Sequence, residues 1–380
     1  MHISKKMFNH YLMDLRPYKT VSQEIWSLPS EEWGKTLKLD WNESTIEPAP
    51  AIKKAVLDFV SSCDFFRLYP ATFNRRLTEL LAQYAGVPEL NVQYFPSSDT
   101  LHEYIARLFV GVGDKVLMLW PSYDNFRSTV EVSGAQVVYS NLNPDFEFNL
   151  LKFKTDIAKE TPKLVYICNP NNPTGLLIPR EQIQDLIRDN PATMFLIDEA
   201  YAEFASQSVN DLVLDYDNIL VTHTLSKAFG LASMRFGYLV SSADNIDAIS
   251  RIRNPKNIQT ISQVAAIAAF EHTDYMRQYV GEVNSAREWF YNAMNDLTGD
   301  GIRKVYPSKS NFLLIRCKDI NTRSRIYYAL REKKIYIRQL SQCASVLDCI
   351  RITIGTRTQM EQTYHALCEI LNIIEEREII

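Results

Sequence analysis

The segment KLVYICNPNNPTG (163–175) shows how the middle of the chain is organised. Its first part, KLVYIC, is a nearly continuous apolar run, as expected of a strand that is buried on both faces of a sheet. Two prolines and a glycine then end the strand sharply. Asn172 lies at this end, where its side-chain amide can donate and accept hydrogen bonds. The segment therefore predicts a buried strand with a polar group at its carboxyl end.

Comparable runs recur on both sides of this segment, and helix-like stretches such as LIPREQIQDLIRDN (177–190) lie between several of them. Alternating strands and helices favour a mostly parallel sheet covered by helices. In such a sheet, ligands bind at the carboxyl ends of the strands. The other predicted strands are KVLMLW (115–120), AQVVYSNL (135–142), TMFLID (193–198), NILVTHTL (218–225) and FGYLVS (236–241).

The C-terminal third has a different pattern. A long helical pattern near 262–297 is followed by three predicted strands, and an amphipathic helix, TQMEQTYHALCEILNIIEE, comes last. We therefore predict a large α/β domain at 46–270, and a smaller α+β domain formed by residues 1–45 and 271–380. The three strands are NFLLIRC (311–317), KIYIRQL (334–340) and CIRITIGT (349–356).

Composition excludes several classes of protein. The chain has 380 residues, of which 46% are hydrophobic, and its net charge of -4 is spread without a basic block. A nucleic-acid or anionic-membrane partner is therefore not expected. The six cysteines show no CxxC spacing, so we predict reduced thiols in a cytoplasmic protein, without a zinc site. No run of 18 apolar residues and no signal-type N-terminus is present, and no membrane span is expected.

Two carboxylates, Asp198 and Glu199, follow the predicted strand TMFLID without a break. A charged group at the end of a buried strand is costly unless it is paired. Asp198 is well placed to hold a protonated ring nitrogen, and the nearby phenol of Tyr201 could reach the same ligand.

The segment THTLSKAFGLASMRFGY (222–238) places Lys227 at the end of another predicted strand. Burial lowers the pKa of a lysine, and a partly neutral amine can attack a carbonyl group. Thr224, Ser226 and Arg235 would provide two hydroxyls and a guanidinium beside it, which is a seat for an anion.

A phosphate site is predicted upstream, in QYFPSSDTLHEYIARLFVGVGD (93–114), which has the pattern of a strand, a polar turn and a helix. Ser98 and Asp99 lie where the helix begins, and free N–H groups at a helix start bind phosphate. Tyr123, after the strand KVLMLW, offers a flat face on which a ring can stack.

Each of these features alone has an ordinary structural explanation: a turn asparagine, an acidic pair at a helix start, a surface lysine, or an N-cap. Together they match one ligand. An amine, a carboxylate for a ring nitrogen, a phenol or amide for a ring hydroxyl, an aromatic face and a phosphate seat suit pyridoxal 5'-phosphate (PLP).

At this level of detail the chain resembles the fold-type I PLP-dependent aminotransferases, and among them most closely the histidinol-phosphate aminotransferase family. The resemblance implies a large domain with a mostly parallel sheet sandwiched by helices, plus a smaller α+β domain. It also implies a homodimer with shared active sites. The matching segments are LRPY (15–18), LDWNES (39–44), NPNNPTG, DEAY, TLSKAFGLASMRFGY and CIRITIGT.

The resemblance implies a role for each candidate residue. Lys227 is the Schiff-base lysine and proton shuttle, Asp198 pairs with the ring nitrogen, and Asn172 and Tyr201 bond the ring oxygen. Tyr123 stacks on the ring. The implied phosphate ligands are Ser98, Asp99, Thr224, Ser226 and Arg235, with Tyr69 reaching the partner subunit's cofactor phosphate. The implied substrate residues are Arg351 for the donor carboxylate, Arg338 for a second anion, Tyr18 for a phosphate, and Asn42.

Two positions depart from the family pattern. Ser97 stands where the phosphate turn commonly has glycine, and a serine serves there if the backbone does not need a positive φ. Lys256, in NPKNIQ, replaces a tyrosine that is common in related enzymes. It would suit a small, strongly anionic substrate, or it points to solvent. The stretch between Tyr18 and Asn42, with Trp26 and Trp33, could also cap the cleft differently.

The expected activity is amino transfer from an amino acid, with glutamate as the implied donor, to a small phosphorylated carbonyl compound, with ping-pong kinetics. The resemblance favours histidinol phosphate and imidazole acetol phosphate. A three-carbon ketone phosphate in sugar or polysaccharide synthesis is the rival. A PLP-dependent decarboxylase of a phosphorylated amino acid remains open. A non-catalytic regulator would need a DNA-binding domain, for which the sequence leaves no room.

Overall fold

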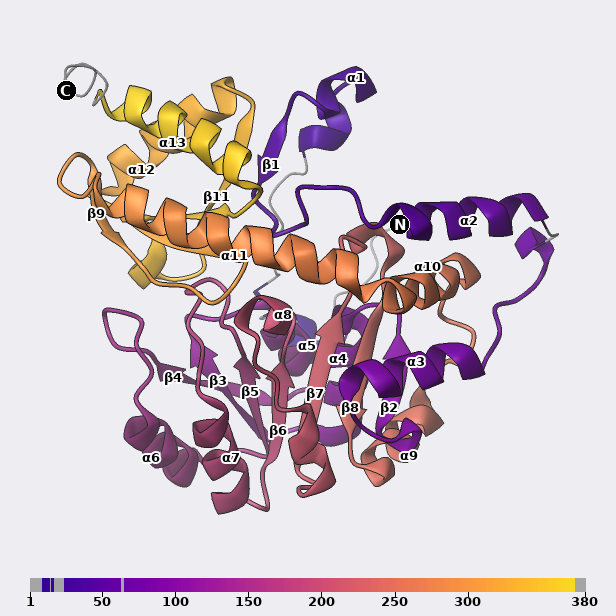
Figure 1. The fold of residues 1–380 in the computed structure, drawn as a ribbon. Helices are drawn as coiled ribbons and strands as arrows, with labels where there is room; N and C mark the ends of the chain where they lie inside the picture. The colour runs from indigo at the N-terminus through magenta and orange to yellow at the C-terminus, as the bar shows by residue number, and fades with distance from the viewer. Residues whose placement is uncertain (1–8, 14, 17–23, 63–64, 373–380) are drawn as a thin grey trace, which may run out of the picture.

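The computed structural model describes residues 9–13, 15–16, 24–62 and 65–372 and contains two sheets (Figure 1). The larger sheet has seven strands, and only β8 runs opposite to the others. The order across the sheet is β2 (Val92–Phe95), β8 (Gly237–Ser241), β7 (Ile219–Thr224), β6 (Met194–Asp198), β5 (Leu164–Cys168), β3 (Lys115–Trp120) and β4 (Gln136–Asn141).

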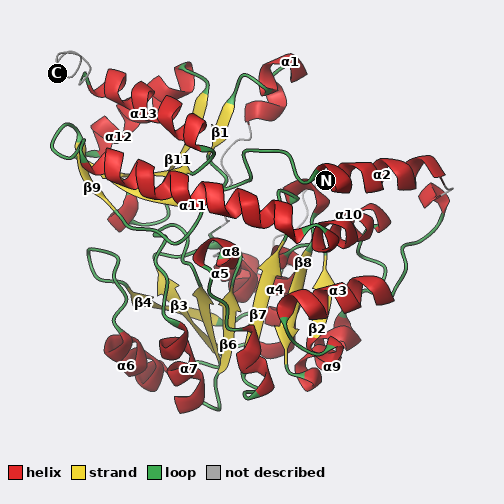
Figure 2. Ribbon diagram, viewed as in Figure 1, coloured by secondary structure: helices red, strands yellow, loops and turns green. Residues whose placement is uncertain are grey.

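Helices enclose this sheet (Figure 2), and every residue of β5, β7 and β8 is buried. This double-sided burial explains why the strands read as apolar runs, and it confirms the predicted fold class. The enclosing helices are α3 (Arg75–Ala85), α4 (Ser98–Phe109), α5 (Asn125–Val132), α6 (Leu150–Glu160), α7 (Arg180–Asp189), α8 (Ala202–Ala205), α9 (Ala243–Ile252) and α10 (Thr260–Glu271), and α2 (Pro50–Ser62) packs against α10.

The smaller sheet combines both ends of the chain. β1 pairs in parallel with β11, and the remaining neighbours pair antiparallel. The N-terminal segment thus packs with the C-terminal third, while the domain boundaries at 45 and 271 stay predictions. The strand order is β1 (Leu37–Leu39), β11 (Ile335–Gln339), β12 (Cys349–Thr353), β10 (Phe312–Cys317) and β9 (Ile302–Val305), with α1 (Ser30–Trp33), α12 (Ile320–Glu332) and α13 (Arg357–Leu371) nearby.

The predicted helical pattern near 262–297 is two helices. α10 ends at Glu271 and α11 (Thr273–Asn295) begins two residues later, because His272 has a non-helical backbone with φ -123° and ψ 41°. α11 then crosses from the larger sheet toward α13 (Figure 1).

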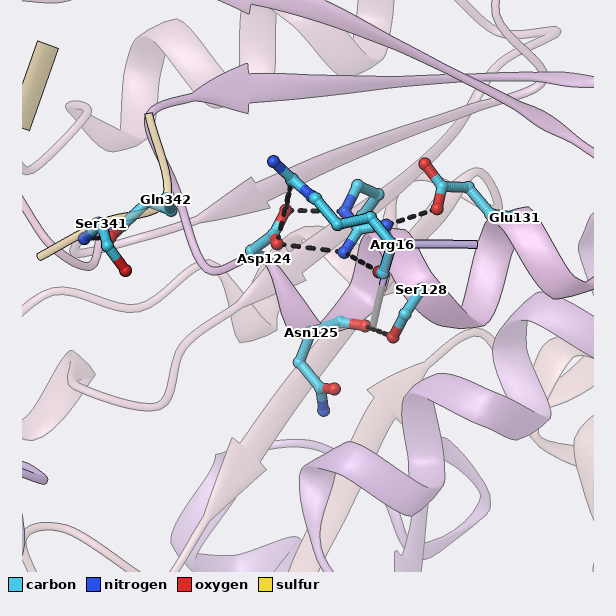
Figure 3. A network of polar contacts seen from close by, with 8 residues as sticks. Arg16, Asp124, Asn125, Ser128, Glu131, Ser341 and Gln342 are labelled. Atoms are coloured by element: carbon cyan, nitrogen blue, oxygen red, sulfur yellow. Dashed lines mark hydrogen bonds and ion pairs between the residues drawn. The ribbon is translucent and has the colours of Figure 1, made fainter. Parts of the chain in front are cut away.

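A polar network around the buried Arg127 fixes Arg16 against α5 (Figure 3). Arg127 is 2% exposed, and its guanidinium donates to both carboxylate oxygens of Asp124 at 2.9 and 3.1 Å, to the backbone oxygen of Arg16 at 2.7 Å, and to Glu131. The Arg16 side chain pairs with Asp124 at 3.2 Å. The network brings the N-terminal segment close to the carboxyl end of β3, although Tyr18 itself lies outside the described residues.

Candidate active site

A cavity of about 620 Å³ lies where β5, β6 and β7 end, between the two sheets. It is lined by most of the side chains that the sequence predicted for the site. These are Asn42, Ser98, Asp99, Tyr123, Asn172, Asp198, Tyr201, Thr224, Ser226, Lys227, Arg235, Arg338 and Arg351. Lining residues that sequence reasoning did not single out include Asp40, Trp41, Glu43, Asn125, Cys168, Ala232 and Ser233.

Lys227 follows β7 and its amine points into this cavity. Its Nζ donates a hydrogen bond to the backbone oxygen of Trp41 at 2.9 Å. Burial lowers the pKa of Lys227 to about 8; Arg351 also lowers it, and Glu43 opposes the shift. A carbonyl oxygen can accept a hydrogen bond from the charged amine and from the neutral amine, so this contact does not fix the protonation state of Lys227. The amine can therefore act as a nucleophile near neutral pH.

This lowered pKa predicts how the apoprotein takes up PLP. Below pH 8 the rate of uptake should rise about tenfold per pH unit, because only the neutral amine attacks, and it should level off above about 8. Stopped-flow absorbance from pH 6 to 10 measures the rate. Free Nα-acetyl-lysine is the control, and its rate should still be rising at pH 10. If the rate of PLP uptake by the protein also keeps rising up to pH 10, the pKa of Lys227 is not lowered.

Asp198 is the last residue of β6 and is 3% exposed. Its carboxylate accepts hydrogen bonds from the Tyr166 hydroxyl at 2.8 Å and from the Ala200 N–H at 3.3 Å. Burial raises the pKa of Asp198, while His102 and the Tyr166 hydrogen bond lower it. A buried carboxylate is stabilised by a cationic partner, and the protonated ring nitrogen of PLP is such a partner.

A chain of hydrogen bonds links the cavity floor to the smaller sheet. The Tyr201 oxygen accepts from Asn42 Nδ2 at 3.0 Å and from Asn172 Nδ2 at 3.2 Å. Arg351 donates from Nη1 to Asn172 Oδ1, and from Nη2 to the backbone oxygen of Asp40, both at 2.7 Å. Burial raises the pKa of Tyr201, so its hydroxyl keeps a proton that it can donate to a ligand.

Asn42 reaches the cavity because its backbone is fixed in a left-handed turn. Its φ is 57°, a conformation that asparagine tolerates well. Its N–H and its Oδ1 both bond the Thr353 hydroxyl, at 3.0 and 3.2 Å, and its backbone oxygen accepts from Asn311 Nδ2 at 3.0 Å. The smaller sheet thus holds the N-terminal segment over the ends of the larger one.

The turn before α4 has the conformation that favours glycine. Ser97 has φ 87° and ψ 158°, and its Oγ accepts from the Thr100 N–H at 3.3 Å. The sequence predicts that a serine serves here if the backbone does not need a positive φ. The backbone does have a positive φ, so that condition is not met. The chain accepts a strained residue, at a cost of about 1–3 kcal/mol, and keeps the N–H groups of the helix start exposed to a ligand.

The remaining anion-binding groups surround this turn. Thr224 Oγ1 donates to Ser226 Oγ at 2.9 Å, and Arg235 Nη2 lies 3.5 Å from Asp99 Oδ2. The Tyr123 hydroxyl donates to Asp99 Oδ1 at 2.9 Å. Two hydroxyls, a guanidinium and a helix start thus meet at one end of the cavity, opposite the small sheet.

Gly237 on β8 packs against the backbone of the same turn. Replacing it with alanine should displace the turn and disturb the end of the cavity that we expect to bind the cofactor phosphate. A Cβ at this position would lie 2.5 Å from Ser98 N, 2.7 Å from Ser97 C and 2.9 Å from His223 O, all backbone atoms. We expect Gly237→Ala to cost about 1–3 kcal/mol in unfolding free energy and to weaken PLP binding.

Chemical denaturation and PLP titration measure these two effects. Gly281→Ala is the matched control, since nothing lies within 4 Å of its Cβ position on α11, and alanine should stabilise that helix by up to about 1 kcal/mol. Unchanged stability and PLP affinity in Gly237→Ala would show that the turn is not held from β8.

Two predicted site residues do not line the cavity of the described chain. Tyr69 is 82% exposed, and Lys256 Nζ lies over its ring at 4.8 Å from the centroid. Lys256 is itself exposed. Their predicted roles in phosphate and substrate binding stay predictions.

Within the described residues, no three His, Cys, Asp or Glu side chains are grouped to hold a metal ion. Over the same residues, no helix is long and apolar enough to span a bilayer.

Known proteins match most of this chain. The family model described as aminotransferase class I and II matches residues 34–367. The chain belongs to this family. The aminotransferase is 40% identical to a dihydroxyacetone phosphate transaminase of Campylobacter jejuni, over 93% of this chain and 94% of that enzyme. It is 34% identical to a histidinol-phosphate aminotransferase of Ruminiclostridium cellulolyticum, over 85% and 89% of the two chains.

A solved structure agrees with this assignment. Histidinol-phosphate aminotransferase from Sinorhizobium meliloti, in complex with PLP, superimposes on the aminotransferase with a TM-score of 0.85. The two are 27% identical, and the match covers 98% of each chain. The expected fold-type I architecture and PLP as the cofactor are thereby confirmed, and the buried Asp198, the lowered pKa of Lys227 and the free helix start of α4 fit that cofactor.

Proposed function

We propose that the enzyme transfers an amino group from an amino acid to a small phosphorylated ketone, with dihydroxyacetone phosphate as the leading acceptor. One observation carries this proposal. A single cavity brings Lys227 and Asp198, from the larger sheet, against Arg338 and Arg351 from the smaller one. The two arginines are paired neighbours on β11 and β12, so two anionic groups can be bound side by side.

Different residues of the site move the proton, hold the cofactor ring and bind the cofactor phosphate. Bound PLP supplies an electron sink for the negative charge that develops at the substrate Cα. Lys227 moves the proton at that carbon, since its pKa near 8 suits both directions of transfer. Asp198 holds the ring nitrogen, and Tyr201 and Asn172 hold the ring oxygen. Ser98, Asp99, Thr224, Ser226 and Arg235 bind the phosphate, and Tyr123 stacks on the ring.

The substrates would be recognised by charge. Arg351 binds the α-carboxylate of the donor, for which glutamate is the expected amino acid, and Arg338 binds a second anion. Dihydroxyacetone phosphate has no carboxylate, so its phosphate is the group that an arginine would hold. The 40% identity to an enzyme named for this acceptor favours it over imidazole acetol phosphate.

A steady-state assay with glutamate and each acceptor tests the proposal. We expect kcat/KM for dihydroxyacetone phosphate to exceed that for imidazole acetol phosphate by at least about tenfold, which corresponds to about 1.4 kcal/mol of difference in transition-state binding. Turnover of imidazole acetol phosphate alone would make histidinol phosphate the substrate pair. Carbon dioxide release without keto-acid formation would instead favour the decarboxylase.

We further propose a cytoplasmic homodimer. An exposed apolar surface supports it, formed by Phe66, Leu68, Tyr69 and Phe73, which are 83%, 59%, 82% and 65% exposed. A patch of this kind marks an interface, and Tyr69 within it would reach the cofactor phosphate of the other subunit. Light scattering of the purified protein tests the dimer, and a monomeric mass at micromolar concentration would reject it.

A further inference from the structure

Two buried polar side chains that do not line the cavity lie behind Asp198. Tyr166, in the middle of β5, is fully buried, and its hydroxyl lies 2.8 Å from Asp198 Oδ2. His102, on α4, is 2% exposed, and its Nε2 lies 4.0 Å from the same oxygen and 3.2 Å from the Thr222 hydroxyl. A sheet core normally holds apolar side chains at such positions, so both groups need an explanation.

The Tyr166 hydroxyl favours the ionised form of Asp198. A donated hydrogen bond stabilises a carboxylate and lowers its pKa, which opposes the effect of burial. Burial also raises the pKa of Tyr166 well above its ordinary value, so the phenol stays protonated and remains a donor. Besides Tyr166 and His102, the titratable groups that interact with Asp198 include Asp99 on α4, Cys168 on β5, and Glu199 and Tyr201, which follow β6.

Packing fixes the direction of this hydrogen bond. Phe126 stacks on the Tyr166 ring at 4.8 Å between centroids, and the edge of His102 meets the same ring at 5.9 Å and 86°. His102 lies one helical turn after Ser98 on α4. A single rigid helix therefore carries both the phosphate end of the site and a group beside Asp198.

We propose that Tyr166 and His102 are positioning residues, which keep the Asp198 carboxylate ionised and aimed into the cavity toward the cofactor's ring nitrogen. The inference rests on the proposed role of Asp198. On this inference, side chains of β5 and α4 hold that carboxylate ionised and correctly oriented before PLP binds. PLP binding then does not require a buried charge to move.

PLP titration of the apoprotein tests this inference, followed by tryptophan fluorescence. We expect Tyr166→Phe to weaken PLP binding by about tenfold to a hundredfold, as for the loss of a hydrogen bond to a charged group. The matched control is Tyr238→Phe, because Tyr238 is equally buried in the same sheet and its hydroxyl has no hydrogen-bond partner among the described residues. The control should bind PLP within about twofold of the wild type.

A double-mutant cycle separates positioning from packing. In the Asp198→Asn background, Tyr166→Phe should add less than about twofold, because the charge that it supports is gone. An equal loss in both backgrounds would overturn the inference and make Tyr166 a packing residue. If Asp198→Asn itself binds PLP normally, the proposed role of Asp198 fails instead, so the two failures are distinguishable.

The visible absorbance of bound PLP gives a second readout, which holds even if Tyr166→Phe is less stable. A positive charge on the ring opposes protonation at the other end of the conjugated system. If the ring's positive charge is held less firmly, protonation at the other end becomes easier and occurs at a higher pH. The pH midpoint of the absorbance change should therefore rise in Tyr166→Phe and in His102→Gln. It should stay unchanged in Tyr238→Phe. Unchanged midpoints in both site variants would contradict the inference.

Discussion

Replacing Lys227 with alanine is expected to lower kcat for amino transfer by at least about a thousandfold, the largest single effect in the protein. Two functions are lost together: the covalent attachment of PLP and the proton transfer at the substrate Cα, which alone contributes about 10²–10⁴-fold. Single-turnover absorbance with glutamate measures the donor half-reaction directly.

Lys163→Ala is the control for this variant. Lys163 lies just before β5, at the opposite end of the sheet, where its Nζ makes an exposed ion pair with Asp114 at 3.0 Å. Such a pair contributes little, so activity should stay within about twofold of the wild type. A Lys227→Ala enzyme that keeps a tenth of wild-type turnover would mean that another amine does the chemistry.

Arg351→Ala should produce the second-largest loss, and it should fall on one half-reaction. Truncating a buried guanidinium that binds a charged group costs about 2–5 kcal/mol, which corresponds to a fall of about 30-fold to 4,000-fold in kcat/KM for the amino donor. The variant also removes the 2.7 Å hydrogen bond that fixes Asn172. Reaction with dihydroxyacetone phosphate should fall less, because that acceptor carries no carboxylate.

Arg338→Ala should show the reverse preference, with the larger loss for the phosphorylated acceptor. Arg357→Ala is the control for both variants, since its guanidinium lies outside the cavity, beside Glu361 and the Trp289 ring. Equal losses in the two half-reactions of Arg351→Ala would contradict the assignment of this arginine to the donor carboxylate.

Much of the larger sheet could be predicted because its strands are buried on both faces. Burial of every residue in β5 or β7 produces a continuous apolar run, and turn residues mark where each run ends. β1 was not predicted, because three residues carry little pattern and their partner β11 lies about 300 positions away. The break at His272 has no proline or glycine to signal it.

The candidate site was predictable where chemistry follows a strand end. Asn172, Asp198 and Lys227 each come after an apolar run, and all three line one cavity. The supporting contacts gave no such signal. Tyr166 reads as one more core residue of KLVYIC, and the group of Trp41 that meets Lys227 is a backbone oxygen.

The strain at Ser97 could be predicted only in part. The family resemblance places Ser97 where glycine is common, which raises the question of a positive φ, but the serine itself does not reveal the observed φ of 87°. Tyr69 and Lys256 do not line the cavity of the described chain, so their roles at the cofactor phosphate and the substrate stay predictions.

Borohydride reduction of the PLP-loaded enzyme, followed by peptide mass analysis, tests the central claim most directly. Reduction fixes the cofactor to the amine that holds it. We predict a single pyridoxyl adduct on the peptide that contains Lys227. An adduct on another lysine, such as Lys38 near the same cavity, or no adduct at all, would contradict the account.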